Sequence, residues 1–393
     1  MKSAMRRVQL SEVMEVERNG IDPSAMEPNC EYIGLDAMDS EGGISRGTTV
    51  ASAQVKSTKF HFTSSHILFG KLRPYLRKVA APDFNGICST DIIPIRPKGN
   101  ADRRYLLHWL RTDEIIHRAT QESSGANLPR ISPSILSSFE IPLPATLAEQ
   151  KRLAAILDQA DAIRRKRQQA LRLTDDFLRS VFLDLFEENR FAPTTIQSLI
   201  DDTTLLYHKD GNHGGLYPRA TEFGAEGIPF ISAKHIDDDG ELNLVRVPLL
   251  GFEKARSLRL GWLQPKDVLL AHNATVGPCA MYDGQFPEAL IGTSLTAFRA
   301  NPNKLLPEFL LAALRSAPFQ KQLYAVMSQT TRNQVPITAQ RTFVLSIPPL
   351  SMQADFARIA EVVNLTRRKE LKALAEAEAL FQSLQHHAFT GQL

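Results

Sequence analysis

Basic and aromatic side chains gather in one short segment of the chain. Tyr75 stands among four basic residues, Lys71, Arg73, Arg77 and Lys78. Lysine and arginine neutralise backbone phosphates, and the forked guanidinium group of arginine also pairs with the edge of guanine. The segment therefore predicts a DNA-binding surface at these four residues, with a solvated basic face as the alternative interpretation.

Two polar loops, 124–130 and 329–336, combine turn residues with side chains that bond bases or phosphates. Asparagine and glutamine pair with adenine, and arginine pairs with guanine. The residues predicted to contact DNA are Asn127 and Arg130 in the first loop, and Arg332, Asn333 and Gln334 in the second. Three further candidates are Lys234, His272 and Asn273.

No set of residues predicts a catalytic or metal centre. The sequence has no Asn-Pro-Pro-Tyr or Asp-Pro-Pro-Tyr motif, no glycine-rich nucleotide fingerprint and no Gly-x-x-x-x-Gly-Lys-Ser/Thr phosphate loop. Its ten histidines lack the spacing of metal ligands. The acidic run 237–239, followed by Gly240, is typical of a turn. We therefore expect a protein that binds no cofactor of its own and catalyses no reaction.

The length and composition limit the kinds of protein that this chain can be. With 393 residues, 43% of them hydrophobic and 23% charged, the chain is long enough for two or three globular domains. The 46 basic and 43 acidic side chains leave a net charge of only +3, so DNA binding requires local positive charge or partner subunits. No apolar run approaches the ~18–20 residues of a membrane span. The start lacks a signal peptide and the three cysteines lie far apart, so we expect a cytoplasmic protein without membrane contact.

The two halves of the chain repeat one plan. Residues 105–111 resemble 309–315, and 141–144 resemble 345–348. Single landmarks recur at a shift of 203 or 204 residues, namely Pro144 with Pro348, Gln150 with Gln353, and Phe186 with Phe389. A nearly constant shift over many landmarks, close to half the chain length, indicates an internal duplication.

Each half alternates short β-like runs with turns and ends in a long helix. Strands are predicted at 64–70, 90–95, 228–232 and 266–270, and shorter helical stretches at 102–119 and 306–327. We therefore predict an α+β fold with a pseudo-two-fold repeat, in which two similar α/β domains are separated by two long helices forming an antiparallel coiled coil. The predicted parts are a first domain at 1–145, a helical spacer at 146–190, a second domain at 191–348 and a second spacer at 349–393.

Two stretches without proline or glycine, 151–192 and 354–390, predict the long helices. Apolar residues at steps of three and four predict a two-helix seam. The positions assigned to the seam or to partner contact are Ile156, Ile163 and Phe177 in the first helix and Ile359, Val363 and Leu380 in the second. Arg167 and Glu370 interrupt the two seams at one heptad position, and they either pair to fix the register or extend to solvent.

A helix from about 152 to 186 spans on the order of 50 Å at ~1.5 Å per residue. Two such helices running antiparallel would place the globular domains at opposite ends. Their length compares with one and a half turns of B-DNA at ~34–36 Å per turn. A basic cluster in the middle of each helix, 164–167 and 367–369, has three interpretations: contact with phosphates between two half-sites, ion pairs with partner subunits, or a solvated face.

The entry to the first helix is the most specific sequence mark. It consists of 141–144 and the run Glu-Gln-Lys-Arg-Leu-Ala-Ala-Ile-Leu at 149–157, with 348–353 as its second copy. The helix exits at 180–186 and 388–393 and the early strand at 227–231 add to it. On these segments the chain resembles, over its whole length, the DNA specificity subunits of type I restriction–modification systems.

The resemblance implies that each globular domain recognises one part of an interrupted duplex DNA target and that the helices set the gap. It also implies that two methylation subunits, and restriction subunits in a complete system, dock on this chain. Those partners are expected to bind S-adenosylmethionine, ATP and Mg, and the assembled complex to methylate DNA, on adenine, and to cleave unmodified DNA using ATP. Because 69–74 and 270–275 share little, we expect an asymmetric target.

Two other classes of protein remain as alternatives. The first is a methyltransferase or nuclease with an unrecognised site, against which the missing motifs argue. The second is a coiled-coil scaffold whose end domains bind proteins, against which the polar loops and basic clusters at matching positions argue.

Overall fold

The computed structural model of the chain describes residues 5–186, 191–237, 240–328 and 333–393. Contacts divide the chain into two compact units. Unit 1 consists of Met1–Gln168 and Lys372–Leu393, and unit 2 consists of Gln169–Leu371. Two long helices, α5 (Leu147–Leu185) and α11 (Leu350–Thr390), each contribute residues to both units.

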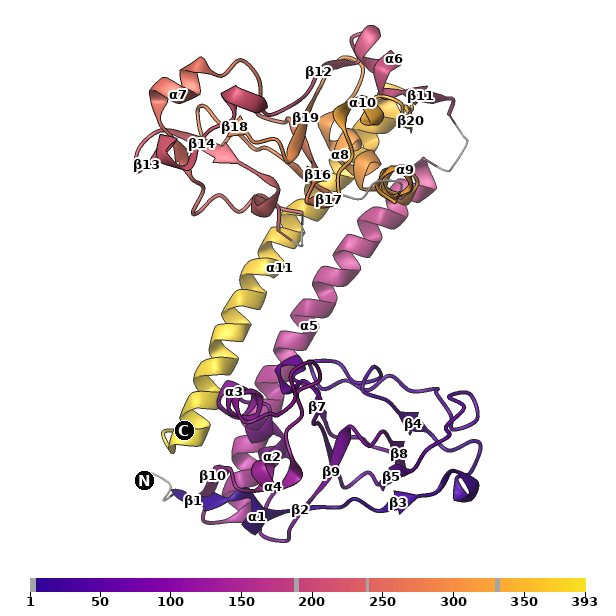
Figure 1. Cartoon of the computed structure of the whole chain (residues 1–393), viewed down its shortest axis with the longest axis vertical. Helices are drawn as coiled ribbons and strands as arrows, with labels where there is room; N and C mark the ends of the chain where they lie inside the picture. The colour runs from indigo at the N-terminus through magenta and orange to yellow at the C-terminus, as the bar shows by residue number, and fades with distance from the viewer. Residues whose placement is uncertain (1–4, 187–190, 238–239, 329–332) are drawn as a thin grey trace. The chain divides into compact units, whose positions relative to one another are not determined.

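Unit 1 contains three small sheets and short helices (Figure 1). Before α5 its elements are β1 (Met5–Gln9), α1 (Leu10–Val13), β2 (Met14–Val16), β3 (Gly20–Ile21), η1 (Pro23–Ala25), β4 (Tyr32–Ile33), β5 (Lys59–Phe62), β6 (Ile67–Gly70), η2 (Pro74–Leu76), β7 (Val79–Ala80), β8 (Gly86–Cys88), β9 (Ile92–Pro97), α2 (Arg103–Leu110), α3 (Asp113–Gln121), α4 (Pro133–Ser137) and β10 (Glu140–Pro144). The sheets have the orders β1-β10, β2-β9-β6-β7 and β3-β5-β8-β4, and only the β4–β8 pair among their described strands is parallel.

Unit 2 repeats this plan. Before α11 its elements are β11 (Pro193–Thr195), α6 (Ile196–Asp201), β12 (Leu205–Asp210), η3 (Gly214–Leu216), η4 (Ala220–Glu222), β13 (Phe223–Gly224), β14 (Ile228–Ile231), η5 (Ala233–His235), β15 (Leu249–Leu250), α7 (Phe252–Ser257), β16 (Val268–Asn273), β17 (Thr275–Met281), β18 (Leu290–Ile291), β19 (Leu295–Ala300), α8 (Pro307–Arg315), α9 (Ala317–Met327), α10 (Ile337–Gln340) and β20 (Val344–Ser346). Its sheets are β11-β20, β12-β19-β16-β17 and β13-β15-β14-β18, with β14 and β18 parallel. The two units therefore share the order of the two-stranded sheet and of the first four-stranded sheet, as the internal repeat predicts. Their second four-stranded sheets differ, because β5 pairs with β8, the later strand of its parallel pair, whereas β15 pairs with β14, the earlier strand.

The shorter helical stretches differ from the prediction. The stretch predicted at 102–119 is two helices, because Thr112 has an extended backbone and its side chain caps α3 by accepting from the N–H of Ile115 at 3.4 Å. The stretch predicted at 306–327 divides at Ser316, which is also extended, but the Ser316 hydroxyl donates to the carbonyl of Ala313 at 2.7 Å and does not cap α9. In both stretches one extended residue ends the first helix and starts the next.

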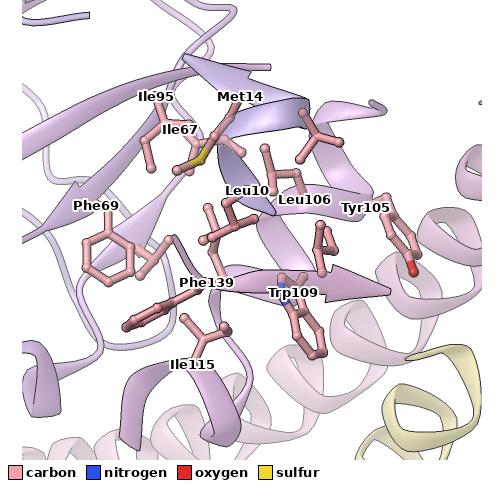
Figure 2. Close-up of a cluster of buried hydrophobic side chains, with 14 of the residues drawn as sticks. Leu10, Met14, Ile67, Phe69, Ile95, Tyr105, Leu106, Trp109, Ile115 and Phe139 are labelled. Atoms are coloured by element: carbon pink, nitrogen blue, oxygen red, sulfur yellow. The ribbon is translucent and has the colours of Figure 1, made fainter. Parts of the chain in front are cut away.

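The core of unit 1 forms where alternate residues of the strands meet the inner face of α2. Figure 2 shows Ile67, Phe69 and Ile95 from the sheet gathered with Leu106 and Trp109 from α2. All five side chains are at most 2% exposed. Alternation along the strands and a three-to-four-residue step along the helix explain why these residues share one core.

The repeated glutamines fasten the start of each long helix. Gln150 is 1% exposed, its Oε1 accepts from the N–H of Asp102 at 2.7 Å, and its Nε2 donates to the carbonyl of Pro144 at 3.3 Å. Gln353 is fully buried and makes the corresponding bonds. Its Oε1 accepts from the N–H of Leu306 at 2.8 Å, and its Nε2 donates to the carbonyl of Pro348 at 2.8 Å. The landmark recurs because a buried backbone N–H and carbonyl need partners in each unit.

Within each unit, parts of α5 and α11 lie side by side in opposite directions. In unit 1, Arg152 donates to the carbonyl of Leu393 at 3.1 Å, and the Arg164 guanidinium group lies 5.5 Å from the Phe381 ring centroid. In unit 2, Asp175 accepts from Arg367 at 2.9 Å, and Phe182 contacts Phe356 with ring centroids 5.5 Å apart. No helix in the described ranges is both long and apolar enough to cross a membrane.

The predicted seam is only partly correct. Val363 is 8% exposed, and Ile156 and Ile359 are half-buried. In contrast, Ile163, Phe177 and Leu380 are 50%, 54% and 52% exposed, so they are not buried in a seam within their units. A straight helix of 3.6 residues per turn drifts by ~20° per heptad away from a 3.5-residue pattern, so a strict heptad does not stay on one face.

Candidate nucleic-acid interface

In unit 1 the loop after α3 lies against the end of strand β6. The N–H of Ile131 donates to the carbonyl of Lys71 at 3.1 Å, and the N–H of Arg73 donates to the carbonyl of Pro129 at 2.8 Å. The N–H of Lys71 donates to the carbonyl of Asp91 at 2.9 Å. The structure thus brings together two segments that the sequence singled out separately. We name Lys71, Arg73, Asp91, Asn127 and Arg130 the edge site of unit 1.

Charged side chains hold this edge site together. Arg130 donates from Nε and Nη2 to the two carboxylate oxygens of Asp91, at 2.8 and 3.2 Å. Lys71 Nζ lies 3.9 Å from the same carboxylate. The hydrogen bonds from Arg130 hold the pKa of Asp91 below its usual range, against the opposing effect of partial burial. The Arg130 side chain is still 40% exposed, so it remains accessible to a ligand.

The loop presents an asparagine beside this ion pair. Asn127 is exposed, and its carbonyl accepts from Arg73 Nη2 at 3.4 Å. Gly125 has a φ of +109°, and a Cβ there would lie 3.0 Å from the carbonyl oxygen of Leu128. Only glycine fits this turn without strain. Tyr75 is 50% exposed on the neighbouring η2 turn.

Arg77 and Lys78 bond elsewhere inside unit 1. Arg77 donates to Asp113 at 2.6 Å and to the carbonyl of Arg111 at 3.0 Å. Lys78 Nζ donates to the carbonyl of Leu35 at 2.5 Å. The four basic residues predicted as one cluster therefore divide into two pairs, of which Lys71 and Arg73 belong to the edge site.

In unit 2 the segment before α10 lies against the end of strand β16. The N–H of Val335 donates to the carbonyl of His272 at 2.8 Å, and the N–H of Ala274 donates to the carbonyl of Asn333 at 2.9 Å. The N–H of His272 donates to the carbonyl of Ser294 at 3.0 Å. We name His272, Asn273, Ser294, Asn333 and Gln334 the edge site of unit 2.

The structure corrects the prediction for His272, which is 1% exposed and therefore buried away from any direct DNA contact. Its Nδ1 lies 3.0 Å from the carbonyl of Val335, and burial lowers its pKa, so a neutral ring donates to that carbonyl. Gln340 Nε2 donates to the same carbonyl at 3.2 Å, and its Oε1 lies 3.2 Å from His208 Nε2. Burial also lowers the pKa of His208, to about 4. Two neutral histidines thus stabilise the loop, His272 directly and His208 through Gln340.

The remaining candidates of unit 2 lie at its surface. Asn333 is exposed, and Asn273 and Gln334 are half-buried and form a bridge between their backbones. Lys234 is exposed on η5, which is tied to this edge because the N–H of Ala233 donates to Ser294 Oγ at 2.9 Å. Arg332 lies outside the described residues.

The two edge sites share one backbone arrangement. Three hydrogen bonds link corresponding segments in each unit, and the residue whose N–H bonds the loop is left-handed in both, with φ +52° at Arg73 and +63° at Ala274. A left-handed residue other than glycine is unusual and often marks a functional site. Sequence reasoning missed Asp91 and Ser294, although they are 203 positions apart and the repeat could have paired them. Within the described ranges, no group of three or more His, Cys, Asp or Glu residues could hold a metal ion.

Comparison with known proteins gives a family likeness for the N-terminal part of the chain. Residues 2–173 match the family described as the type I restriction modification DNA specificity domain. This region is thus similar to type I restriction–modification DNA specificity domains. The edge site of unit 1 lies entirely within the matched residues.

Over 189 residues the chain is 29% identical to the type I restriction enzyme EcoDI specificity subunit of Escherichia coli, and the match covers 47% of this chain and 41% of that subunit. The aligned part is thus less than half the length of this relative.

Solved structures extend the likeness in fold beyond residues 2–173. The type I restriction–modification S subunit from M. genitalium has a TM-score of 0.61 at 14% identity, covering 98% of this chain and 96% of that chain. A chain from a study of complex assembly and conformational transition in the type I restriction–modification system has a TM-score of 0.53 at 23% identity, covering 100% of both chains. The mixed helix and sheet fold predicted from the sequence is therefore confirmed.

Proposed function

We propose that this chain is the DNA-reading subunit of a type I restriction–modification enzyme, and that each unit reads one part of a two-part, asymmetric duplex target. The observation that carries the proposal is the pair of edge sites. The same three backbone hydrogen bonds join a strand end to a polar loop in both units, but the side chains differ. A fixed backbone with variable side chains suits two readers of different base sequences.

The accessible side chains of the edge sites are the proposed DNA contacts. They are Lys71, Arg73, Asn127 and Arg130 in unit 1, and Lys234, Asn273, Asn333 and Gln334 in unit 2, with Arg332 as a further candidate. The first set suits phosphates and guanine, and the second, rich in amides, suits adenine. Arg77, Lys78 and His272 act instead by holding the backbone in place, as their internal bonds indicate.

The long helices are proposed to pair as an antiparallel coiled coil that sets the gap between the two parts of the target. The opposed directions of α5 and α11 inside each unit support this. The 39 residues of α5 correspond to roughly 58 Å at ~1.5 Å per residue. That length exceeds one turn of B-DNA, ~34–36 Å, so it suits two half-sites that are a turn or more apart.

Methylation subunits, two per chain, are the proposed partners of the helices. Apolar side chains on α5 and α11 that are at least half exposed offer a surface for them, namely Ile163, Leu173, Phe177, Leu183, Val362, Leu365 and Leu380. Burial of such side chains contributes ~25 cal/mol per Å² of apolar surface, which favours association. The chain itself is proposed to be non-catalytic. S-adenosylmethionine would bind the methylation subunits, and ATP and Mg the restriction subunits where the system has them.

The methylome of a host without other DNA modification, expressing this chain with its methylation subunit, tests the proposal. We expect one two-part motif with a fixed gap and two different halves, methylated on adenine. A well-formed complex that methylates no such motif would contradict the proposal and favour a scaffold. Methylation by this chain alone would reveal a catalytic site and also contradict it.

A further inference from the structure

A short hairpin in each unit reaches one of the long helices. In unit 1, Asp39 Oδ1 accepts from the N–H of Gly43 at 2.7 Å, and Gly42 has a φ of +81°. In unit 2, Asp237 Oδ1 accepts from the N–H of Glu241 at 2.8 Å. Residues 238–239 of the acidic run lie outside the described residues. The same aspartate side-chain bond to the N–H four positions later therefore occurs in both units.

Corresponding arginines at the ends of α2 and α8 donate hydrogen bonds to backbone carbonyls of the two hairpins. Arg111 donates to the carbonyl of Glu41, and Arg315 donates to the carbonyls of Gly240 at 2.7 Å and of Cys279 at 2.9 Å. A Cβ added at Gly42 would lie 3.1 Å from the Arg111 guanidinium group, and one at Gly240 would lie 2.5 Å from that of Arg315. Both glycines thus permit a close approach of arginine to the hairpin backbone.

Corresponding arginines on the long helices complete the contact. Arg164 of α5 pairs with Glu41 of the hairpin and, at 2.7 Å, with Asp161 of its own helix. Arg367 of α11 lies 3.5 Å from Glu241 of the other hairpin. Both arginine side chains are largely buried, at 13% and 7% exposure, so they are not part of a solvated basic face.

The acidic partners occupy different positions of the two hairpins. The turn bonds align Gly43, not Glu41, with Glu241. The arginines, in contrast, recur at the constant shift, Arg164 with Arg367. The same ion pair is therefore made in both units from acids at non-equivalent positions, which indicates that the contact itself has a role in both.

We propose that Arg164 with Glu41, and Arg367 with Glu241, are positioning residues that latch each DNA-reading unit's hairpin to a long helix and so fix the gap at which both half-sites are read. The latch (these two ion pairs) rests on the proposed function. A guanidinium group held between hairpin and helix resists rotation of one against the other, because rotation would separate a largely buried charge from its acidic partner on the hairpin and leave it with its helix partner, Asp161 for Arg164 and Asp175 for Arg367. Loosening a latch lets its unit shift along DNA without changing the side chains that meet the bases.

The test uses the complete complex with its methylation subunits and duplexes that carry both half-sites at the native gap or at a gap changed by one base pair. Glu41→Gln removes the charge but keeps the backbone bond from Arg111. Arg164→Ala leaves Asp161 paired with Arg165 at 2.8 Å. For each variant we expect the ratio of altered-gap to native-gap methylation to rise about tenfold, corresponding to about 1.4 kcal/mol. The base preference of each half-site stays unchanged, and Arg164→Lys restores most of the discrimination.

Arg118→Ala is the matched control, because Arg118 pairs at 3.0 Å with Glu122, the residue that follows α3, and not with the hairpin. Its gap ratio should equal that of the wild type. If the latch variants lose methylation equally on all gaps, the residues are merely structural and the latch is refuted while the proposed function stands. A wild-type complex that methylates no two-part duplex contradicts the proposed function itself.

Discussion

The edge sites of units 1 and 2 share one backbone arrangement, but charged side chains support the first and neutral side chains support the second. In unit 1 the loop is held by a carboxylate, Asp91, between Arg130 and Lys71. In unit 2 the corresponding support is neutral, with His272 and Gln340 bonded to a single carbonyl. The backbone arrangement is therefore separable from the side chains that stabilise it. A duplicated reader can keep its geometry while each copy changes the bases it recognises.

The largest expected difference between the units is their response to acid. Unit 2 has three histidines with a lowered pKa, His208, His235 and His272, whereas unit 1 has His66. A histidine with a lowered pKa in the folded state takes up its proton more readily when unfolded, so stability falls as the pH drops below about 6.5. For His208, with a pKa of about 4, the loss between pH 7 and pH 5 amounts to about 2 kcal/mol.

Hydrogen exchange, corrected for intrinsic rates, measures this effect as the free energy of opening in each unit. We expect unit 2 to lose more stability than unit 1 over this pH range. His208→Gln keeps a neutral polar side chain near Gln340 and should reduce the pH dependence of unit 2. Equal losses in both units would contradict the assignment.

His272 and Lys71, which occupy corresponding strand ends, should contribute differently to the free energy of unfolding. His272→Ala removes a buried ring and leaves the carbonyl of Val335 with one side-chain donor fewer, which costs about 1.5 kcal/mol. Lys71→Ala removes a partly exposed ammonium group 3.9 Å from its partner, which costs about 0.5 kcal/mol or less. Thermal unfolding of both variants measures this, and an equal loss would show that the two sites are held alike.

The stability of the two loops should depend differently on salt concentration. Asp91→Asn weakens the bidentate pair with Arg130 and should cost about 0.5–1 kcal/mol in unit 1 at low salt. The same substitution should have little effect at 1 M NaCl, because salt already screens the pair. Exchange of amides in 124–131 reports the first loop and exchange in 333–340 the second. A salt-dependent second loop would contradict its neutral support.

The smallest expected effect concerns the shared left-handed residue. Ala274→Gly relieves the strain of a φ of +63° but gives the unfolded chain more freedom, so we expect a net stabilisation of about 0.5 kcal/mol. Arg73→Gly relieves the same strain but also removes the bond to Asn127, so it should not stabilise. Denaturant unfolding compares the two variants, and destabilisation by Ala274→Gly would refute strain at this position.

The repeat and the two long helices follow from the sequence because they depend on local composition and on a constant shift. Gln150 and Gln353 illustrate this, since each bonds the start of a long helix to a backbone N–H of its own unit. The sequence does not predict the division of the helical stretches at Thr112 and Ser316, because a single residue with an extended backbone interrupts a continuing apolar pattern.

The candidate site was predictable as segments but not as a set of contacts. The sequence identifies both the strand ends and the polar loops, yet it gives no means of seeing that Asp91 lies between Lys71 and Arg130. Nor does it distinguish His272, which is buried, from Asn273 beside it, which is half-buried, since this depends on which face of a strand meets the core. Burial and pairing arise from tertiary contacts that no local pattern contains.

The central claim is that each edge site reads one part of the target, and paired loop variants test it most directly. The methylome would be compared between a complex carrying Asn127→Ala with Arg130→Ala and one carrying Asn333→Ala with Gln334→Ala. We expect the first variant to relax or abolish one part of the motif and the second variant the other part, with the gap unchanged in both. If both variants degrade the same part, or if neither changes any base preference, the account of two separate readers is contradicted.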